Sequence, residues 1–111
     1  MVDIEKIKND IVECLTPLDP DKIILFGSYA YGRPTEESDI DLLLLKDNIR
    51  AEKSRDLRVD ARMNLRKVGS KYKIGFDVLS ASTTDINKRE DYFYKVDILA
   101  KGKVLYERKS S

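Results

Sequence analysis

Residues 22–45 have the sequence KIILFGSYAYGRPTEESDIDLLLL, and this stretch decides the fold. The apolar run over 23–26 predicts a buried strand over 22–26 that ends at Gly27, and the apolar run over 42–45 predicts a second strand over 39–45. The polar segment between them contains a further glycine, and a short helix is expected to open at Ser28, whose hydroxyl can serve as its N-cap. The stretch therefore puts a Gly-Ser turn after one strand and two carboxylates at the head of the next.

The two carboxylates belong to Asp39 and Asp41. Along a strand, residues i and i+2 point to the same face, so these side chains are predicted to lie side by side while Ile40 points to the opposite face. Adjacent carboxylates repel unless a cation lies between them, and magnesium is the divalent ion that suits oxygen ligands and retains substrate phosphates. Backbone N–H groups of a Gly-Ser turn can hold those phosphates. The combination indicates phosphoryl or nucleotidyl transfer, whereas either part alone also fits a tight turn and a solvated strand.

A wider pattern joins the turn to the acidic pair. Phe26-Gly-Ser-Tyr-Ala-Tyr-Gly32, followed by Ser38-Asp-Ile-Asp-Leu-Leu43, resembles the signature of the DNA polymerase beta-like nucleotidyltransferase superfamily. More narrowly, it resembles the small stand-alone minimal nucleotidyltransferases (MNT), the MntA-like antitoxins of bacteria and archaea. The likeness is sharp over residues 23–45 and collinear over the rest of the chain. It implies nucleotide-binding roles for Gly27, Ser28, Gly32, Arg33 and Ser38.

The resemblance has one departure, at Tyr31. Family members often carry Arg at this position of the turn, so a basic phosphate contact is either missing here or supplied elsewhere, by Arg33. Tyr29 and Tyr31 flank the turn and could stack on a base, but packing is the favoured interpretation for each of them.

Active sites of the family use a third carboxylate on a later strand, and residues 73–80 offer one. With a period of two, Asp77 falls on the opposite face of this predicted strand from its apolar neighbours at 74, 76 and 78. An aspartate inside an apolar strand is costly to bury without a partner. We therefore expect Asp77 to join the acidic pair, the alternative being an edge strand that exposes it to water.

The resemblance implies two-metal catalysis, in which Asp39, Asp41 and Asp77 act both as metal ligands and as catalytic residues. Asp39 and Asp41 would hold the magnesium ion that carries the triphosphate of ATP. With Asp77 they would also hold a second magnesium ion, which lowers the pKa of the attacking hydroxyl. Asp77 would accept or steer the proton of that hydroxyl. The reaction would pass AMP to the hydroxyl and release pyrophosphate, mainly through positioning and charge neutralisation.

The acceptor is implied by the family and by no residue of this chain. Larger members need an additional domain that binds the acceptor, whereas the stand-alone members are commonly paired with a helical HEPN-domain protein, as antitoxin and toxin. The nucleotidyltransferase then adds AMP to a tyrosine near the HEPN ribonuclease site and silences it, so contact with RNA is expected only indirectly. Two alternatives remain open. One is a degenerate fold that neutralises its partner by contact, and the other is an enzyme acting on a small molecule or an RNA end with a separate acceptor-binding subunit.

The composition is typical of one small intracellular domain, and a single nucleotidyltransferase domain is expected over residues 1–111. The sole cysteine, Cys14, allows no intrachain disulfide and is expected to fill the core. The chain contains no histidine, which excludes Ser-His and Cys-His catalysis and histidine-bound zinc. It contains neither an apolar run of membrane-spanning length nor a signal-peptide pattern, so a cytoplasmic protein without membrane contact is expected.

The remaining pattern alternates helices with strands. Helices are predicted over 3–16, 49–68 and about 91–100, with a further helical stretch capped by Ser82, Thr83 or Thr84, and strands are predicted over 73–80 and 104–106. Pro17 and Pro20 end the first helix, and Gly69 is the expected C-cap of the second. The predicted class is α/β or α+β, with a small mixed sheet of about four strands and helices packed on it. The resemblance implies the palm-like nucleotidyltransferase version of this class.

Charge is distributed unevenly along the chain, although the net charge is only +1. Residues 1–45 hold 4 basic and 10 acidic residues, a net of −6, whereas residues 46–73 hold 10 basic and 4 acidic residues, a net of +6. In the second helix Arg58, Arg62 and Arg66 follow one another at i, i+4 and i+8, a spacing at which like charges cost about 0.2–0.5 kcal/mol per pair. This basic row is interpreted either as a solvated face or as a contact for an acidic protein, RNA or the nucleotide phosphates.

Overall fold

The computed structural model describes residues 2–88 and 93–109. The fold is built on a four-stranded sheet with the strand order β3-β2-β1-β4. The strands are β1 (Lys22–Phe26), β2 (Ile40–Leu45), β3 (Phe76–Ala81) and β4 (Lys103–Glu107). β1 runs antiparallel to both β2 and β4, whereas β2 and β3 are parallel. The predicted small mixed sheet is therefore confirmed.

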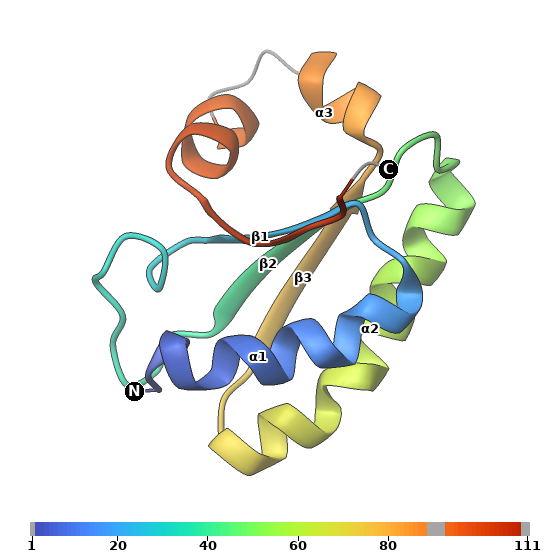
Figure 1. Cartoon of the computed structure of the whole chain (residues 1–111). Coiled ribbons are helices and arrows are strands. Elements are labelled where there is room, and N and C mark those ends of the chain that lie inside the picture. Colours follow the sequence, from blue (N-terminus) through green and yellow to red (C-terminus); the bar gives the residue numbers. More distant parts are fainter. Residues whose placement is uncertain (1, 89–92, 110–111) are drawn as a thin grey trace.

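Helices cover both faces of this sheet. They are α1 (Ile4–Leu15), the short 3-10 helix η1 (Thr16–Leu18), α2 (Ala51–Tyr72), α3 (Thr83–Lys88) and the π-helix η2 (Phe93–Ala100). Figure 1 shows α1 and α2 on one face, and α3 with η2, the orange-red coil next to it, on the other. α2 joins β2 to β3 and is the long crossover that two parallel strands require. Within the described residues no helix is both long and apolar enough to span a membrane.

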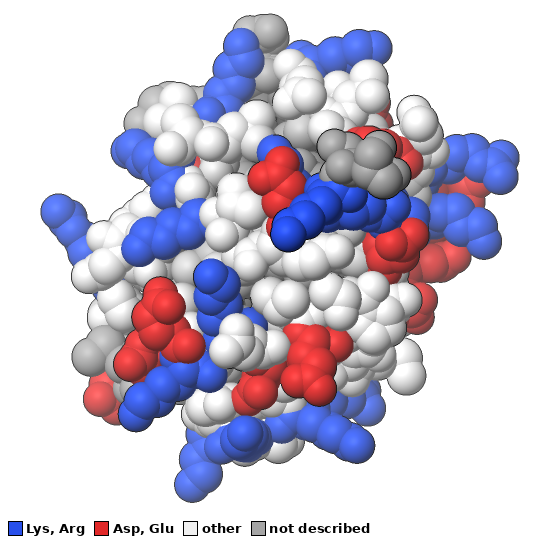
Figure 2. Space-filling model, viewed as in Figure 1, with Lys and Arg blue, Asp and Glu red and all other residues white. Residues whose placement is uncertain are grey.

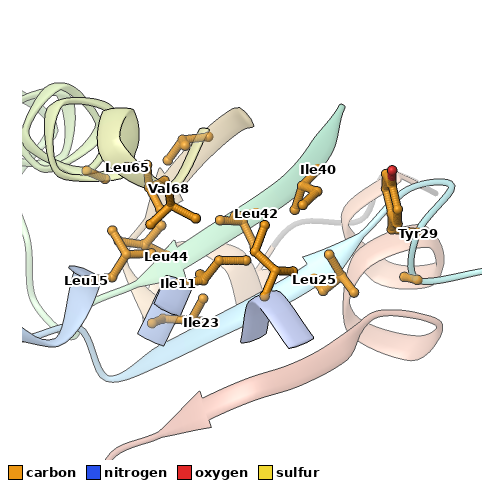
Figure 3. Packing of buried hydrophobic residues seen from close by; sticks show 14 of the residues in the cluster. Ile11, Leu15, Ile23, Leu25, Tyr29, Ile40, Leu42, Leu44, Leu65 and Val68 are labelled. Atoms are coloured by element: carbon orange, nitrogen blue, oxygen red, sulfur yellow. The ribbon is translucent and has the colours of Figure 1, made fainter. Parts of the chain in front are cut away.

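The main core lies between the sheet and the helices α1 and α2. Ile7, Ile11 and Leu15 of α1 are fully buried, at a spacing that places them on one face of the helix. Figure 3 shows this cluster, in which α1 packs against side chains of β1, β2 and α2: Ile23, Leu25, Ile40, Leu42, Leu44, Leu65 and Val68. Fully burying each such side chain stabilises the fold by about 1.5–3 kcal/mol. Cys14 is partly buried at the margin of this core, as expected.

A smaller core lies on the opposite face of the sheet. It is formed by side chains of β1, β2, α3 and η2: Ile24, Phe26, Leu43, Leu45, Ile86 and Ile98. Both faces of β1 and β2 are therefore covered, which explains why residues 23–26 and 42–45 are continuously apolar instead of alternating. Asp41 and Asp77 point to this second face, because each is two positions from a leucine of its own strand, Leu43 or Leu79, that packs there.

The second helix is longer than the sequence predicts. α2 continues to Tyr72, so Gly69 lies inside its last turn and is not its C-cap. The C-cap is Lys73, which has a φ of 55° and donates its backbone N–H to the Gly69 carbonyl. The Ile74 carbonyl lies 2.9 Å from the point where a Cβ of Gly69 would be. This glycine therefore admits a close return of the chain over the helix instead of ending it.

Two strand boundaries also shift. β2 begins at Ile40 instead of residue 39, and β3 covers Phe76–Ala81 instead of 73–80, because residue 73 still belongs to the end of α2. The predicted faces of β3 are confirmed. Val78 is buried in the main core, whereas Leu79 packs against the smaller one.

The remaining helices and strands agree with the predicted pattern. The helix over 3–16 and the strand over 104–106 are confirmed within one residue at each end. Ser82 caps α3, because its Oγ accepts a hydrogen bond from the backbone N–H of Asp85 at 3.0 Å. The helix predicted near 91–100 corresponds to η2 from residue 93 onward, and residues 91 and 92 lie outside the described residues.

The basic row of α2 lies along an edge of the sheet. Arg62 Nη2 donates to the Val78 carbonyl of the edge strand β3 at 3.4 Å, and Arg58 Nη1 donates to a serine hydroxyl of the same strand at 3.3 Å. These contacts give two of the arginines acceptors and cover an otherwise open strand edge. Figure 2 shows basic and acidic side chains interspersed over the viewed face. Folding therefore mixes the charges that the sequence separates, as where Lys71 of α2 pairs with Asp10 of α1 at 3.3 Å.

Candidate active site

The predicted acidic residues come together where β2 and β3 begin. The parallel register places Asp41 of β2 directly beside Asp77 of β3. Asp39 lies one residue before β2, and its Oδ1 is 2.5 Å from the point where a Cβ of Gly75 would be. The two segments are already paired at this point, because Ile40 donates its backbone N–H to the Gly75 carbonyl at 2.9 Å. The structure therefore brings all three carboxylates to one end of the sheet.

Burial and crowding act together on the carboxyl group of Asp41. The pKa of Asp41 is raised from 3.8 to about 6, mainly because partial burial disfavours the charged form. Repulsion by Asp77 and Asp39, which are both exposed, adds to this effect. In the part of the chain that the structure describes, no hydrogen bond or ion pair neutralises any of the three. The cluster therefore favours a bound cation.

The turn after β1 brings its backbone against this cluster. Gly27 has a φ of +73°, and a Cβ on it would overlap the Asp41 carboxylate. Its carbonyl accepts from the backbone N–H groups of Ala30 at 3.0 Å and Tyr31 at 3.1 Å. Gly27 is therefore needed both for its left-handed backbone conformation and for the close approach of the aspartate.

The prediction of a short helix that opens at Ser28 is wrong, because residues 28–32 form a tight turn. The Ser28 carbonyl accepts from the backbone N–H of Arg33 at 2.9 Å, which closes the turn. Gly32, with a φ of +74°, redirects the chain. Pro34 then disfavours helical backbone in the residue before it. These turn-forming residues override the N-cap preference of the serine.

A cavity of about 480 Å³ lies beside Asp41 and Asp77. It is lined by Phe26, Gly27, Tyr31, Asp41, Asp77, Leu79 and Asp97. The sequence did not indicate that Tyr31 and Asp97 would meet here, where the Tyr31 hydroxyl donates to the Asp97 carbonyl at 2.7 Å and joins the turn to η2. The sequence could nevertheless have indicated Asp97, because it is an acidic residue among the apolar residues of 96–99. The same pattern led to the prediction of Asp77.

The other predicted nucleotide-binding residues are placed differently. Of the five, Gly27 lines the acidic cavity itself, and Arg33 lines a second cavity of about 490 Å³ that shares one tyrosine with the first. Gly32 has open space beside its Cα, and Ser28 is half-buried in the turn. Ser38 is engaged in the loop before β2, where its Oγ accepts from a loop backbone N–H at 2.8 Å.

The donor set of the cluster fits a hard divalent cation. Magnesium in proteins is usually held by one or two carboxylates, with water and substrate phosphates completing its shell. No group of three or more Asp, Glu, His or Cys side chains within residues 2–88 and 93–109 forms a ready metal site. Asp41 and Asp77, with Asp39 beside them, therefore match a magnesium site that the phosphates of a substrate complete.

Comparison with known proteins points to one family. A family model described as "Polymerase beta, Nucleotidyltransferase" matches residues 5–111. Two proteins of Methanocaldococcus jannaschii are similar in sequence. "Putative protein adenylyltransferase MJ0604" is 38% identical over 86 residues, which are 77% of this chain and 77% of that protein. "Putative protein adenylyltransferase MJ0141" is 32% identical over 84 residues, which are 68% of this chain and 78% of that protein.

Solved structures show the same fold. A crystal structure of a toxin–antitoxin with AMP-PNP has a TM-score of 0.59 at 23% identity, covering 92% of this chain and 74% of that chain. A mutant of the toxin–antitoxin MntA–HpeT has a TM-score of 0.54 at 23% identity, with the same coverage of 92% and 74%. Because the family model spans nearly the whole sequence and the relatives align over most of it, the chain belongs to the polymerase beta nucleotidyltransferase family.

Proposed function

We propose that this nucleotidyltransferase transfers AMP from ATP to a hydroxyl group of a partner protein, a tyrosine of a HEPN toxin, and thereby acts as an antitoxin. The observation that carries the proposal is the in-register pairing of Asp41 with Asp77, in a cavity whose wall includes the Gly27 turn. The names of the two archaeal relatives support a protein acceptor, and the similarly folded toxin–antitoxin structures support an antitoxin role. The HEPN identity of the partner and its tyrosine rest on the family resemblance.

Asp41 and Asp77, with Asp39 beside them, are the residues that would hold magnesium. When bound, magnesium neutralises negative charge on the phosphates and activates the attacking hydroxyl. A cation at this position would also offset the repulsion that contributes to the raised pKa of Asp41.

The remaining steps are assigned to groups of the chain itself. The backbone N–H groups of Ser28 and Tyr29 are not used by the hydrogen bonds that close the turn, which leaves them for phosphate oxygens. Asp77 is exposed at the cavity and accepts the proton of the incoming hydroxyl. The hydroxyl oxygen bonds to the α-phosphorus, the bond from that phosphorus to the bridging oxygen breaks, and pyrophosphate leaves with the electron pair.

The nucleotide site is tested by isothermal calorimetry of ATP with magnesium. Wild type is expected to bind, and the double variant Asp39→Asn, Asp41→Asn is expected to lose magnesium-dependent binding. Asp56→Asn, which removes one exposed carboxylate from α2, is the matched control and is expected to bind like wild type. Failure of wild type to bind ATP would contradict the proposal and favour an antitoxin that acts by contact alone.

The acceptor is tested with radiolabelled ATP and the product of the neighbouring reading frame. Label that enters this partner protein, at a tyrosine identified by mass spectrometry, is the expected result. Label that enters RNA or a small molecule instead would overturn the protein acceptor while leaving the nucleotidyltransferase activity in place.

A further inference from the structure

The second cavity adjoins the acidic one and has the opposite charge. It is lined by Ala30, Tyr31, Arg33 and Lys101, and Tyr31 also lines the acidic cavity, so the two are neighbours. Among the described residues, neither Arg33 nor Lys101 forms an ion pair with a carboxylate. One side of Tyr31 therefore carries clustered acidic groups, and the other carries two basic groups without acidic partners.

Lys101 is held at this cavity by the backbone on both sides of it. Its own N–H donates to the Val96 carbonyl at 2.9 Å, and the N–H of Gly102 donates to the Ile98 carbonyl at 2.9 Å. Gly102 fits tightly against β1, since a Cβ on it would lie 2.7 Å from Ile24 Cγ2. The segment after η2 is therefore fixed against the central strand, which sets where the lysine side chain starts.

The Lys101 ammonium group can leave its present contact easily. Its Nζ lies 5.9 Å from the centroid of the Tyr31 ring, near the outer limit of about 6 Å for a cation–π contact. The Tyr31 ring itself is tied to η2 through the hydrogen bond from its hydroxyl to the Asp97 carbonyl. A phosphate oxygen in the cavity can therefore attract the ammonium group away from a wall that stays in place.

We propose that Lys101, together with Arg33, binds the terminal phosphates of the nucleoside triphosphate, the part that leaves as pyrophosphate. This inference rests on the proposed function and deepens it. Phosphate oxygens that no metal neutralises are repelled by Asp41 and Asp77, whereas the adjoining cavity attracts them. Lys101 thus supplies, from the segment after η2, the positive charge that the turn lacks at Tyr31.

The test compares Lys101→Ala and Lys101→Arg with wild type, using ATP and inorganic triphosphate, each with magnesium. ATP binding is measured by calorimetry, and inorganic triphosphate is measured by its displacement of ATP. Loss of a charge-assisted contact is expected to weaken the binding of both ligands about tenfold in Lys101→Ala. Lys101→Arg keeps the charge and is expected to stay within about threefold of wild type. Lys53→Ala removes the same charge from an exposed position on α2 and is the matched control, with both affinities unchanged.

The outcomes separate this inference from the proposed function. If wild type binds ATP and Lys101→Ala binds it equally well, the role of Lys101 is overturned while the nucleotide site stands. If the variant binds ATP more weakly than wild type but binds inorganic triphosphate equally well, Lys101 acts on the nucleoside. The phosphate assignment is then overturned. Absence of ATP binding in wild type would remove the proposed function and this inference together.

Discussion

Replacing Asp41 by Asn is expected to stabilise the metal-free protein above about pH 6. Because folding raises the pKa of Asp41 from 3.8 to about 6, the folded protein binds a proton at this position more tightly than the unfolded chain does. The free energy of unfolding therefore falls as the pH rises from about 4 through about 6, where the folded state must release that proton. Asn cannot ionise, so the variant avoids this loss.

The size of the gain follows from the same pKa. The difference between 3.8 and about 6 corresponds to roughly 3 kcal/mol, at about 1.36 kcal/mol per pH unit. Asp41 is half-buried, and solvent screening weakens the effect, so we expect about half of that value, roughly 1–1.5 kcal/mol, at pH 8. With an m value of about 2 kcal/mol per molar urea, the unfolding midpoint rises by roughly 0.5–0.8 M. Below about pH 4 the gain disappears, because wild type is then protonated as well.

The assay is urea denaturation of wild type and Asp41→Asn at pH 4 and pH 8, with a chelator present. The difference between the free energies of unfolding of the two proteins at each pH removes the contributions of the other titrating groups. Asp56→Asn on the exposed face of α2 serves as the control. Its free energy of unfolding is expected to stay within about 0.5 kcal/mol of wild type at both pH values. A variant that is less stable than wild type at pH 8, or one whose gain is the same at both pH values, would refute the reasoning.

Three further predictions concern the turn, the core and the contact with η2. Gly27→Ala is expected to cost at least about 1–2 kcal/mol in urea denaturation, because of the positive φ, and to abolish ATP binding in calorimetry, because the added methyl group displaces the Asp41 carboxylate. Ile11→Ala creates a cavity in the main core and is expected to cost about 2–5 kcal/mol in the same denaturation assay; a smaller loss would place this residue outside the core. Tyr31→Phe removes the hydroxyl that donates to η2 and is expected to cost about 0.5–1.5 kcal/mol, with faster hydrogen exchange in η2 as its local signature. Unchanged exchange in that helix would show that the hydrogen bond does not hold it.

The main elements of the fold could be predicted because their patterns are local. The apolar run over 23–26 indicates a buried strand, and the spacing of Ile7, Ile11 and Leu15 indicates one buried helix face. The end of α2 could not be predicted, because a glycine such as Gly69 can either cap a helix or admit a close neighbour. The approach of the Ile74 carbonyl, which decides between these roles, is a tertiary contact.

The acidic half of the site could be predicted, and the basic half could not. Asp39 and Asp41 are two positions apart, so strand geometry puts them on one face, and the family resemblance implied that Asp77 on a later strand would join them. The contact between Tyr31 and Asp97 joins residues 66 positions apart, and Lys101 reaches its cavity through the packing of η2 on β1. Neither arrangement leaves a periodic trace in the sequence.

The parallel pairing of β2 with β3 has a consequence for refolding. A β-hairpin can form from neighbouring residues, whereas these two strands must wait until the whole of α2 has folded back across the sheet. Closing so long a connection costs chain entropy before any strand contact rewards it, which makes such pairings slow to form. We therefore expect Asp41 and Asp77 to become neighbours late, after α1 and the β1–β2 pair have assembled. The recovery of nucleotide binding should accordingly lag behind the recovery of helical circular dichroism when the denatured chain is returned to native buffer.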